Sequence, residues 1–260
     1  MYYTEYKENI STALLLAAGT GSRLRPLTNY IPKCLARVNE APILEHLVQC
    51  LHQHNFKRLV VVVGHLEQGI RDLLDKIAGN LTVEYIVSPQ YETTNNIYSL
   101  WLAREIIQEP FVLIECDLVF TPSLLEEMLL PDRIAISHIL PWMNGSTVTI
   151  SARSPHHVTD LHINPNGNTN GTTYKTVNIY SLSHQSWSRI IRRLDFYISA
   201  GRVNAFYESV FAEMIADGSL NLESVFFDKA FWYEIDTLRD LREGARIFQQ
   251  TENKLEFGKK

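Results

Sequence analysis

The sequence predicts an α/β protein with a mostly parallel sheet and a strand-rich insertion or lid in its second half. Up to Thr121, short apolar runs alternate with amphipathic segments. A short run that is apolar throughout is typical of a parallel strand, because such a strand is buried on both faces. Strands that alternate with helices through right-handed crossovers form a parallel sheet covered by helices. After Thr121 the expected strands follow one another closely, which indicates the strand-rich region.

In the first half, the apolar runs predict strands at residues 13–18, 59–63, 83–87 and 111–115. The segments between them predict helices at residues 43–51, 67–77 and 96–107. In the last of these, Ile97, Leu100, Trp101 and Ile107 recur at helical spacing.

In the second half, the pattern predicts strands at residues 133–139, 146–153, 157–163 and 175–181. Residues 165–171 consist of Pro, Asn, Gly and Thr, which predicts a turn. The remaining segments predict helices at 184–199 and 205–216, short strands at 225–227 and 231–235, and a closing helix at 237–249. We therefore expect a single domain over residues 1–260, with an N-terminal extension at 1–11 and a strand-rich region at about 133–181.

Composition and charge restrict the class of function. The chain has 24 basic and 29 acidic side chains and a formal net charge of −5, so it lacks the basic excess of a general nucleic-acid binder. Cys34, Cys50 and Cys116 are widely spaced and odd in number, which predicts neither a zinc site nor a disulfide framework. The first residues are polar, and no apolar run approaches the roughly 20 residues of a membrane span. We expect a cytoplasmic protein that binds neither nucleic acid nor a membrane.

The first predicted strand ends in a glycine-containing loop that is suited to binding phosphate. Gly19 and Gly21 have small neighbours, so the backbone N–H groups of the loop can face an anion. Three cationic side chains follow within reach of the loop, namely Arg23, Arg25 and Lys33. A donor-rich loop followed by cations indicates an enzyme that handles a nucleoside triphosphate.

Two better-known phosphate loops do not fit this segment. A Walker A loop needs Gly-Lys-Ser/Thr after its glycines, and that sequence is missing here. A dinucleotide fingerprint needs a third glycine three positions after Gly21, where this chain has Leu24.

Residues 16–28, with Pro32 and Lys33, resemble the nucleoside-triphosphate transferase motif L-A-A-G-x-G-x-R-L-x-P-L-T followed by P-K. The resemblance implies a Rossmann-like three-layer α/β/α fold with a mostly parallel mixed sheet. It also implies an enzyme that binds a nucleotide with Mg²⁺ and joins a nucleotidyl group to an acceptor phosphate with loss of pyrophosphate. On this basis Arg23 and Lys33 are the expected catalytic cations, and the expected nucleotide-binding residues of the loop are Ala17, Ala18, Gly19, Gly21, Ser22 and Arg23.

Two carboxylates are expected to hold the Mg²⁺. Asp117 follows the fourth predicted strand, at the end where α/β sheets bind ligands, and Mg²⁺ often takes only one or two protein carboxylates. Asp117 also occupies the metal-binding position of the resembling family, and we expect Glu115 to point to the opposite face. Tyr-Glu-Ile-Asp at 233–236 resembles the family's second metal motif, in which Asp236 is the ligand. The alternatives are that Asp117 caps a turn and that Asp236 is the N-cap of the closing helix.

The segment Asn-Asn-Ile-Tyr-Ser-Leu at 95–100 resembles phosphocholine and phosphonate cytidylyltransferases more than sugar-1-phosphate enzymes. Amide side chains offer both a donor and an acceptor, which suits the edge of a pyrimidine. We therefore expect Asn95 and Asn96 to bind the nucleotide, which would be CTP. An ordinary helix N-cap at either asparagine is the alternative.

The acceptor side of the site is expected in the strand-rich region and the helix after it. Lys175 could meet the acceptor's phosphonate, or it could be an ordinary surface lysine. Tyr207 and Glu208 match the region that lines the choline end in phosphocholine enzymes, although the aromatic pair is partly replaced and the acid is Glu. The alternative is an amphipathic helix with Phe206 buried and Glu208 solvated.

Three functions compete. The first is cytidylyl transfer from CTP to a small phosphonate or phospho-amino alcohol, such as 2-aminoethylphosphonate or phosphocholine, with release of pyrophosphate. The second is transfer to a sugar-1-phosphate from UTP or dTTP, and the third is a non-catalytic nucleotide-binding module. The presence of Arg23, Lys33, Asp117 and Asp236 favours an enzyme. The pattern leaves the acceptor, the oligomeric state and membership of a larger fusion protein open.

Overall fold

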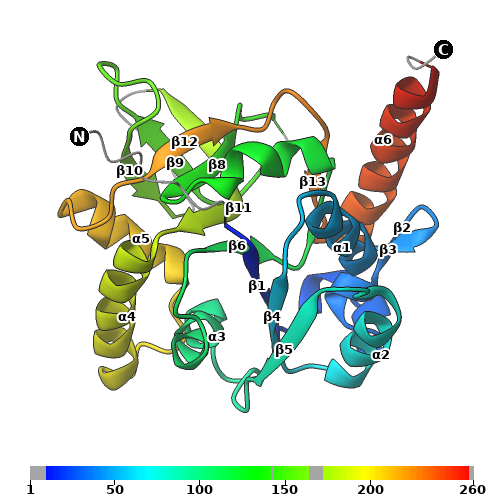
Figure 1. The fold of residues 1–260 in the computed structure, drawn as a ribbon, viewed down its shortest axis with the longest axis horizontal. Helices are drawn as coiled ribbons and strands as arrows, with labels where there is room; N and C mark the ends of the chain where they lie inside the picture. Colours follow the sequence, from blue (N-terminus) through cyan, green and yellow to red (C-terminus); the bar gives the residue numbers. More distant parts are fainter. Residues whose placement is uncertain (1–9, 142, 164–171, 258–260) are drawn as a thin grey trace, which may run out of the picture.

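The computed structural model describes residues 10–141, 143–163 and 172–257 (Figure 1). The four strands predicted in the first half are confirmed as β1 (Thr12–Ala17), β4 (Arg58–Val63), β5 (Thr82–Val87) and β6 (Phe111–Glu115). They lie side by side in the order β6-β1-β4-β5, and all three pairings are parallel. The carboxyl ends of these strands therefore share one edge of the sheet.

Both faces of β1, β4 and β6 are buried, which explains their mostly apolar runs, whereas the edge strand β5 is only partly buried. On β1, Leu14 and Leu16 belong to one core cluster, whereas Ala13 and Leu15 belong to the other. Helices α1 (Ile43–Gln53) and α2 (Glu67–Ile77) pack on the second of these faces. Helices α3 (Asn96–Leu102), α4 (His184–Ser199) and α5 (Tyr207–Ala216) pack on the first. The fold is thus a three-layer α/β/α arrangement.

The sheet continues beyond β6 with antiparallel strands from the second half of the chain. The central one is β11 (Thr173–Leu182), which pairs with β6, β8 (Arg133–Ser137) and β9 (Thr147–Ile150). Strand β10 (Val158–His162) extends this side from β9, and β12 (Glu223–Phe226) lies parallel to β8. The sheet is therefore mixed but mostly parallel in its first half. The turn expected at 165–171 lies outside the described residues, as do residues 1–9 of the expected N-terminal extension.

Several elements differ from the sequence-based expectations. The helix predicted over 96–107 ends at Leu102 and continues only as a 3₁₀ turn at Ala103–Glu105. Helix α6 (Leu238–Phe257) is longer than predicted and stands out from the sheet (Figure 1). The short hairpin β2 (Arg37–Val38) and β3 (Ala41–Pro42) was not expected, nor were the 3₁₀ helices Ser22–Leu24, Leu27–Asn29, Lys33–Leu35 and Pro122–Leu129. Within the described ranges no helix is long and apolar enough to cross a membrane.

One unexpected pairing positions the site. Strand β7 (Leu118–Phe120), directly after β6, pairs antiparallel with β13 (Trp232–Glu234). The backbone N–H of Ile235 continues this pairing by donating to the carbonyl oxygen of Asp117 at 2.8 Å. The ladder therefore places the chain around Asp236 beside Asp117, although the two residues are far apart in the sequence.

Candidate active site

A cavity of about 710 Å³ opens beside the carboxyl ends of β1 and β6. Its wall comes from the glycine loop, the start of α3, the loop at 143–146, β11 and the end of β13. Most of the predicted site residues line it, namely Ala18, Gly19, Gly21, Ser22, Arg23, Lys33, Asn95, Asn96, Asp117, Lys175, Glu208 and Asp236. Ala17 and Tyr207 are buried and are not part of this wall. The structure thus brings together segments from the whole length of the chain.

The absence of a side chain has a different structural consequence at each of the two glycines of the loop. Gly21 has a left-handed backbone (φ +60°), and a Cβ atom there would lie 3.0 Å from Thr28 Cγ2 and 3.1 Å from Lys33 Cβ. The Thr28 hydroxyl also donates to the Gly21 carbonyl oxygen at 2.9 Å. Gly21 is therefore needed to pack the loop against the segment that carries Lys33. A Cβ atom on Gly19 would meet no atom within 4 Å, so Gly19 leaves open space at the cavity.

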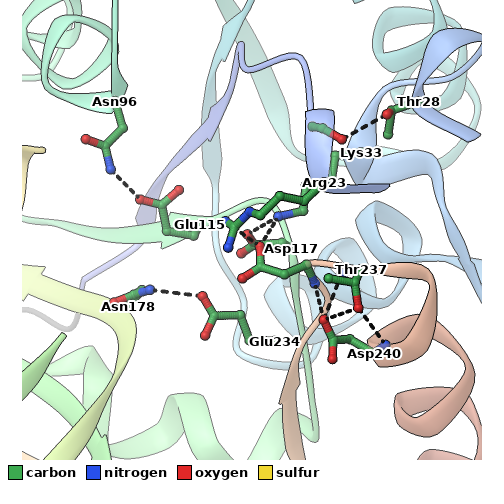
Figure 2. A network of polar contacts seen from close by, with 12 residues as sticks. Arg23, Thr28, Lys33, Asn96, Glu115, Asp117, Asn178, Glu234, Thr237 and Asp240 are labelled. Atoms are coloured by element: carbon green, nitrogen blue, oxygen red, sulfur yellow. Dashed lines mark hydrogen bonds and ion pairs between the residues drawn. The ribbon is translucent and has the colours of Figure 1, made fainter. Parts of the chain in front are cut away.

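Lys33 lies between two carboxylates (Figure 2). Its Nζ is 2.6 Å from Asp117 Oδ2 and 2.7 Å from Asp236 Oδ1. Arg23, which is largely exposed, reaches the same Asp236 oxygen at 2.7 Å. Burial lowers the pKa of Lys33, but Asp117 and Asp236 outweigh it and raise that pKa well above the usual lysine value. Lys33 is therefore a fixed positive charge in the cavity.

Three carboxylates can converge on a divalent cation. One oxygen each from Asp117, Glu234 and Asp236 lies within 4.8 Å of the others. Oδ1 of Asp117 is buried and has no hydrogen-bond partner among the described residues. Carboxylate oxygens are hard ligands of the kind that Mg²⁺ and Ca²⁺ prefer, so this donor set fits such an ion.

Glu234 was missed in the sequence, where only Asp236 was selected from the Tyr-Glu-Ile-Asp motif. Glu234 ends β13, and Asp236 follows two residues later. Residues two apart in an extended chain point to the same side, and this spacing could have identified both carboxylates. The pKa of Glu234 is raised to about 7, chiefly by burial, although the nearby Lys175 opposes this rise.

The helix-cap alternative for Asp236 does not hold. Helix α6 begins with a reciprocal cap made by the next residues: Asp240 Oδ2 accepts from Thr237 N at 2.8 Å, and Thr237 Oγ1 accepts from Asp240 N at 3.2 Å. Asp240 Oδ2 also accepts from the backbone N–H of Asp236 at 3.3 Å. The carboxylate of Asp236 is left to Lys33 and Arg23. The turn-cap alternative for Asp117 fails as well, because one of its oxygens binds Lys33 and the other has no partner among the described residues.

The expectation that Glu115 points away from the site was wrong. Glu115 lines the same cavity as Asp117. The two residues are two positions apart, a spacing that keeps side chains on one side of an extended chain. Burial raises the pKa of Glu115, and the nearby carboxylates of Asp117 and Glu208 raise it further.

Asn96 joins two acidic side chains of the cavity, Glu115 and Glu208. Its Nδ2 lies 3.4 Å from Glu115 Oε1 and 3.3 Å from Glu208 Oε2, while its Oδ1 accepts from Tyr207 N at 3.0 Å. The amide of Asn96 is therefore engaged on both sides within the protein. Asn95 is the N-cap of α3, as in the alternative interpretation, and its side chain accepts from Asn96 N at 2.8 Å.

Lys175 and Glu208, which are expected on the acceptor side, do not lie at the surface as the alternative interpretations required. Lys175 is not a surface lysine: its side chain is 3% exposed, and its Nζ lies 3.3 Å from Glu234 Oε2. Glu208 is 7% exposed and Phe206 is 42% exposed, the reverse of the amphipathic-helix alternative. Tyr207 is buried behind the cavity wall, where its ring contacts Tyr180 and Phe211.

A family model describes the same part of the chain. Residues 13–254 match the MobA-like NTP transferase domain. The chain belongs to the MobA-like NTP transferase family. This match spans the glycine loop, both candidate metal-binding motifs and the residues expected on the acceptor side.

Similar proteins include named cytidylyltransferases. The chain is 28% identical over 240 residues to CMP-5'-(3-aminopropyl)phosphonate synthase of Streptomyces rubellomurinus, a match that covers 89% of this chain but 38% of that protein. It is 26% identical over 225 residues to 2-aminoethylphosphonate cytidylyltransferase of Lancefieldella rimae, covering 83% of this chain and 85% of that one. A third relative, choline-phosphate cytidylyltransferase of Streptococcus pneumoniae, is 34% identical over 101 residues, or 39% of this chain and 42% of the relative.

Solved structures share the fold. The CTP:phosphocholine cytidylyltransferase of Streptococcus pneumoniae superposes with a TM-score of 0.79, covering 92% of this chain and 99% of that one at 21% identity. A UDP-glucose pyrophosphorylase in complex with UDP-glucose gives a TM-score of 0.77 at 16% identity, covering 93% of this chain and 99% of that one. These similarities confirm the Rossmann-like α/β fold.

Proposed function

We propose that the protein transfers a cytidylyl group from CTP to a small phosphonate or phosphate acceptor and releases pyrophosphate. The observation that carries the proposal is the placement of Lys33 between Asp117 and Asp236, beside the glycine loop. This arrangement brings together, in one cavity, a loop suited to a triphosphate, a fixed cation and carboxylate oxygens suited to a metal ion, and it therefore supports the proposal. The names of the relatives support CTP as the nucleotide.

Mg²⁺ is the cofactor that we propose for Asp117, Glu234 and Asp236. When bound there, it would neutralise charge on the phosphates and favour departure of pyrophosphate. The chain's own residues supply the rest. The backbone N–H groups of the glycine loop bind the triphosphate, and Arg23 and Lys33 stabilise the negative charge that develops on it.

The acceptor oxygen attacks the α-phosphorus of CTP in line with the departing pyrophosphate. The acceptor is already an anion, so no side-chain base has to remove a proton from it. The main barriers are repulsion between two anions and their orientation. Lys175 is buried, lines the cavity and is the residue that we propose to hold the phosphonate or phosphate, while the glycine loop holds the nucleotide.

The acidic pair Glu115 and Glu208 favours an acceptor that carries an amine. Both carboxylates line the cavity, and Asn96 bridges them. A primary ammonium has three N–H donors for such oxygens, whereas a quaternary ammonium has none and is usually held by aromatic faces. We therefore favour an aminoalkylphosphonate over phosphocholine as the acceptor.

A pyrophosphate-release assay tests the proposal. CTP, UTP, dTTP and ATP would each be combined with 2-aminoethylphosphonate, 3-aminopropylphosphonate, phosphocholine and glucose-1-phosphate in the presence of Mg²⁺. We expect turnover with CTP and the two aminoalkylphosphonates. Preference for UTP or dTTP with glucose-1-phosphate would instead establish a sugar nucleotidyltransferase. Binding of CTP without release of pyrophosphate for any pair would indicate a non-catalytic module.

A further inference from the structure

Asn178 has an unusual backbone conformation for a residue inside a strand. Its φ is +59°, and the pairing of β11 with β8 shifts register between Thr176 and Tyr180. A residue with a side chain rarely adopts a positive φ, although Asn tolerates it better than most. Such strained positions gather at functional sites, and Asn178 lines the active-site cavity.

The side-chain amide of Asn178 has a defined direction. The hydroxyl of Thr176, a fully buried residue, lies 2.9 Å from Asn178 Oδ1 and 3.0 Å from the Ser146 carbonyl oxygen, so its single proton is shared between two acceptors. On the other side of the amide, Nδ2 faces Glu234 Oε1 at 3.5 Å (Figure 2), and an ionised carboxylate oxygen can only accept a hydrogen bond. The amide therefore presents its donor, and not its acceptor, to the carboxylate.

Glu234 is held at both of its oxygens by residues of the same strand. Asn178 faces Oε1, and Lys175 Nζ lies 3.3 Å from Oε2. In a regular strand, positions three apart project to opposite faces. The irregular backbone at Asn178 is what allows both side chains to reach one carboxylate.

We infer that Asn178 is a positioning residue that fixes the Glu234 carboxylate for the divalent cation. The inference rests on the proposed function, in which Glu234 is one of three Mg²⁺-binding carboxylates. Lys175 also holds Glu234 but is the proposed partner of the acceptor's phosphonate or phosphate group. When Lys175 turns to the acceptor, Asn178 keeps Glu234 in place. The strained backbone at Asn178 is thus explained by its side-chain amide, which this conformation directs towards Glu234.

The test compares Asn178→Gly with Asn55→Gly. Glycine adopts a positive φ without strain, so neither substitution should lower the midpoint of thermal unfolding. Asn55 is a matched control because it is exposed, has the same φ of 59° and follows α1, outside the residues that line the cavity. The readouts are Mn²⁺ affinity in the presence of CTP without acceptor, measured by electron paramagnetic resonance, and kcat and KM in the complete reaction.

We expect Asn178→Gly to weaken Mn²⁺ binding and lower kcat by about ten- to a hundred-fold, as is typical of groups that orient metal ligands. The KM for the acceptor should stay within about twofold, because Lys175 is intact, and Asn55→Gly should match the wild type. Wild-type Mn²⁺ affinity and kcat in Asn178→Gly would overturn the inference. A lower unfolding midpoint with unchanged Mn²⁺ affinity would also overturn it, because the role would then be structural. If the wild-type protein itself bound no Mn²⁺, the proposed metal site would fail, and that result is visible without any variant.

Discussion

The side-chain nitrogen of Lys33 lies 2.6 Å from Oδ2 of Asp117 and thereby joins two motifs that are 84 residues apart. We expect Lys33→Ala to lower kcat by about 10²–10³, the usual cost of losing one charge contact to a transition state. Mn²⁺ should bind at least as tightly as before, because the cation that competes for Asp117 and Asp236 is gone. Steady-state kinetics and electron paramagnetic resonance measure the two effects. Near-normal turnover would show that Lys33 does not stabilise the transition state.

Gly19→Ala should lower the affinity for CTP without lowering the stability of the fold. A Cβ atom at Gly19 meets nothing within 4 Å, so we expect an unchanged midpoint of thermal unfolding. The added methyl group would occupy the open space where the triphosphate is expected, so CTP affinity should fall. Gly21→Ala is the contrasting variant, because its positive φ and its contacts with Thr28 and Lys33 make it destabilising. Calorimetry with CTP, together with thermal unfolding, measures both properties. If Gly19→Ala bound CTP normally, the triphosphate would have to lie elsewhere.

Asp240→Ala should affect both the helix and the site. Asp240 caps α6 through Thr237 and accepts from the backbone of Asp236, so its loss should cost about 1 kcal/mol of unfolding free energy. It should also weaken Mn²⁺ binding by about tenfold or more, because Asp236 loses its support. Ser183→Ala is a matched control, since Ser183 caps α4 by accepting from Ser186 N at 3.0 Å. We expect the control to lose a similar unfolding free energy and no metal affinity, and equal losses of metal affinity in the two variants would refute the positioning role.

The order of the strands and helices was predictable because the hydrophobic periodicity of a segment is a property of its local sequence. The runs that became β1, β4 and β6 are mostly apolar, since helices cover both faces of these strands, whereas the edge strand β5 is partly exposed and carries Glu84. The pairing of β7 with β13 was not predictable, because it depends on two short segments that meet only after the chain has folded. The roles of Asn96 and Glu115 were hidden for the same reason: a hydrogen bond between α3 and the end of β6 leaves no local pattern. The sequence motifs thus identified the reactive groups, whereas the contacts that support these groups could be found only in the folded structure.

The ion pair between Asp217 and Arg193 predicts a dependence of stability on acid pH. Hydrogen bonds from Ser219 and Arg193 lower the pKa of Asp217 to about 2, below its ordinary value of 3.8. Because the folded pKa is lower than the unfolded one, the contribution is complete above about pH 4 and is lost as the pH falls towards 2. The difference in unfolding free energy between wild type and Asp217→Asn, measured by urea denaturation, should therefore shrink over this range. A difference that stays constant from pH 5 to pH 2 would show that Asp217 is not paired in solution.

The acidic pair in the cavity predicts how the enzyme selects its acceptor. Glu208 is buried, and burial raises the pKa of its carboxyl, so the ionised form gains from a cationic ligand. We expect Glu208→Gln to raise the KM for 2-aminoethylphosphonate by about ten- to a hundred-fold, the range for losing a hydrogen bond to a charged group. The KM for CTP should not change, because the variant keeps the nucleotide end of the cavity intact.

Ethylphosphonate, which lacks the amine, is the matched ligand for this experiment. Its KM should be high in the wild type and should not rise in Glu208→Gln, because the removed charge has no ammonium to bind. If both ligands lost affinity to the same extent, Glu208 would support the fold of the cavity and not recognise the amine. Comparing the two phosphonates in one variant therefore separates recognition of the ammonium from a general change in the shape of the site.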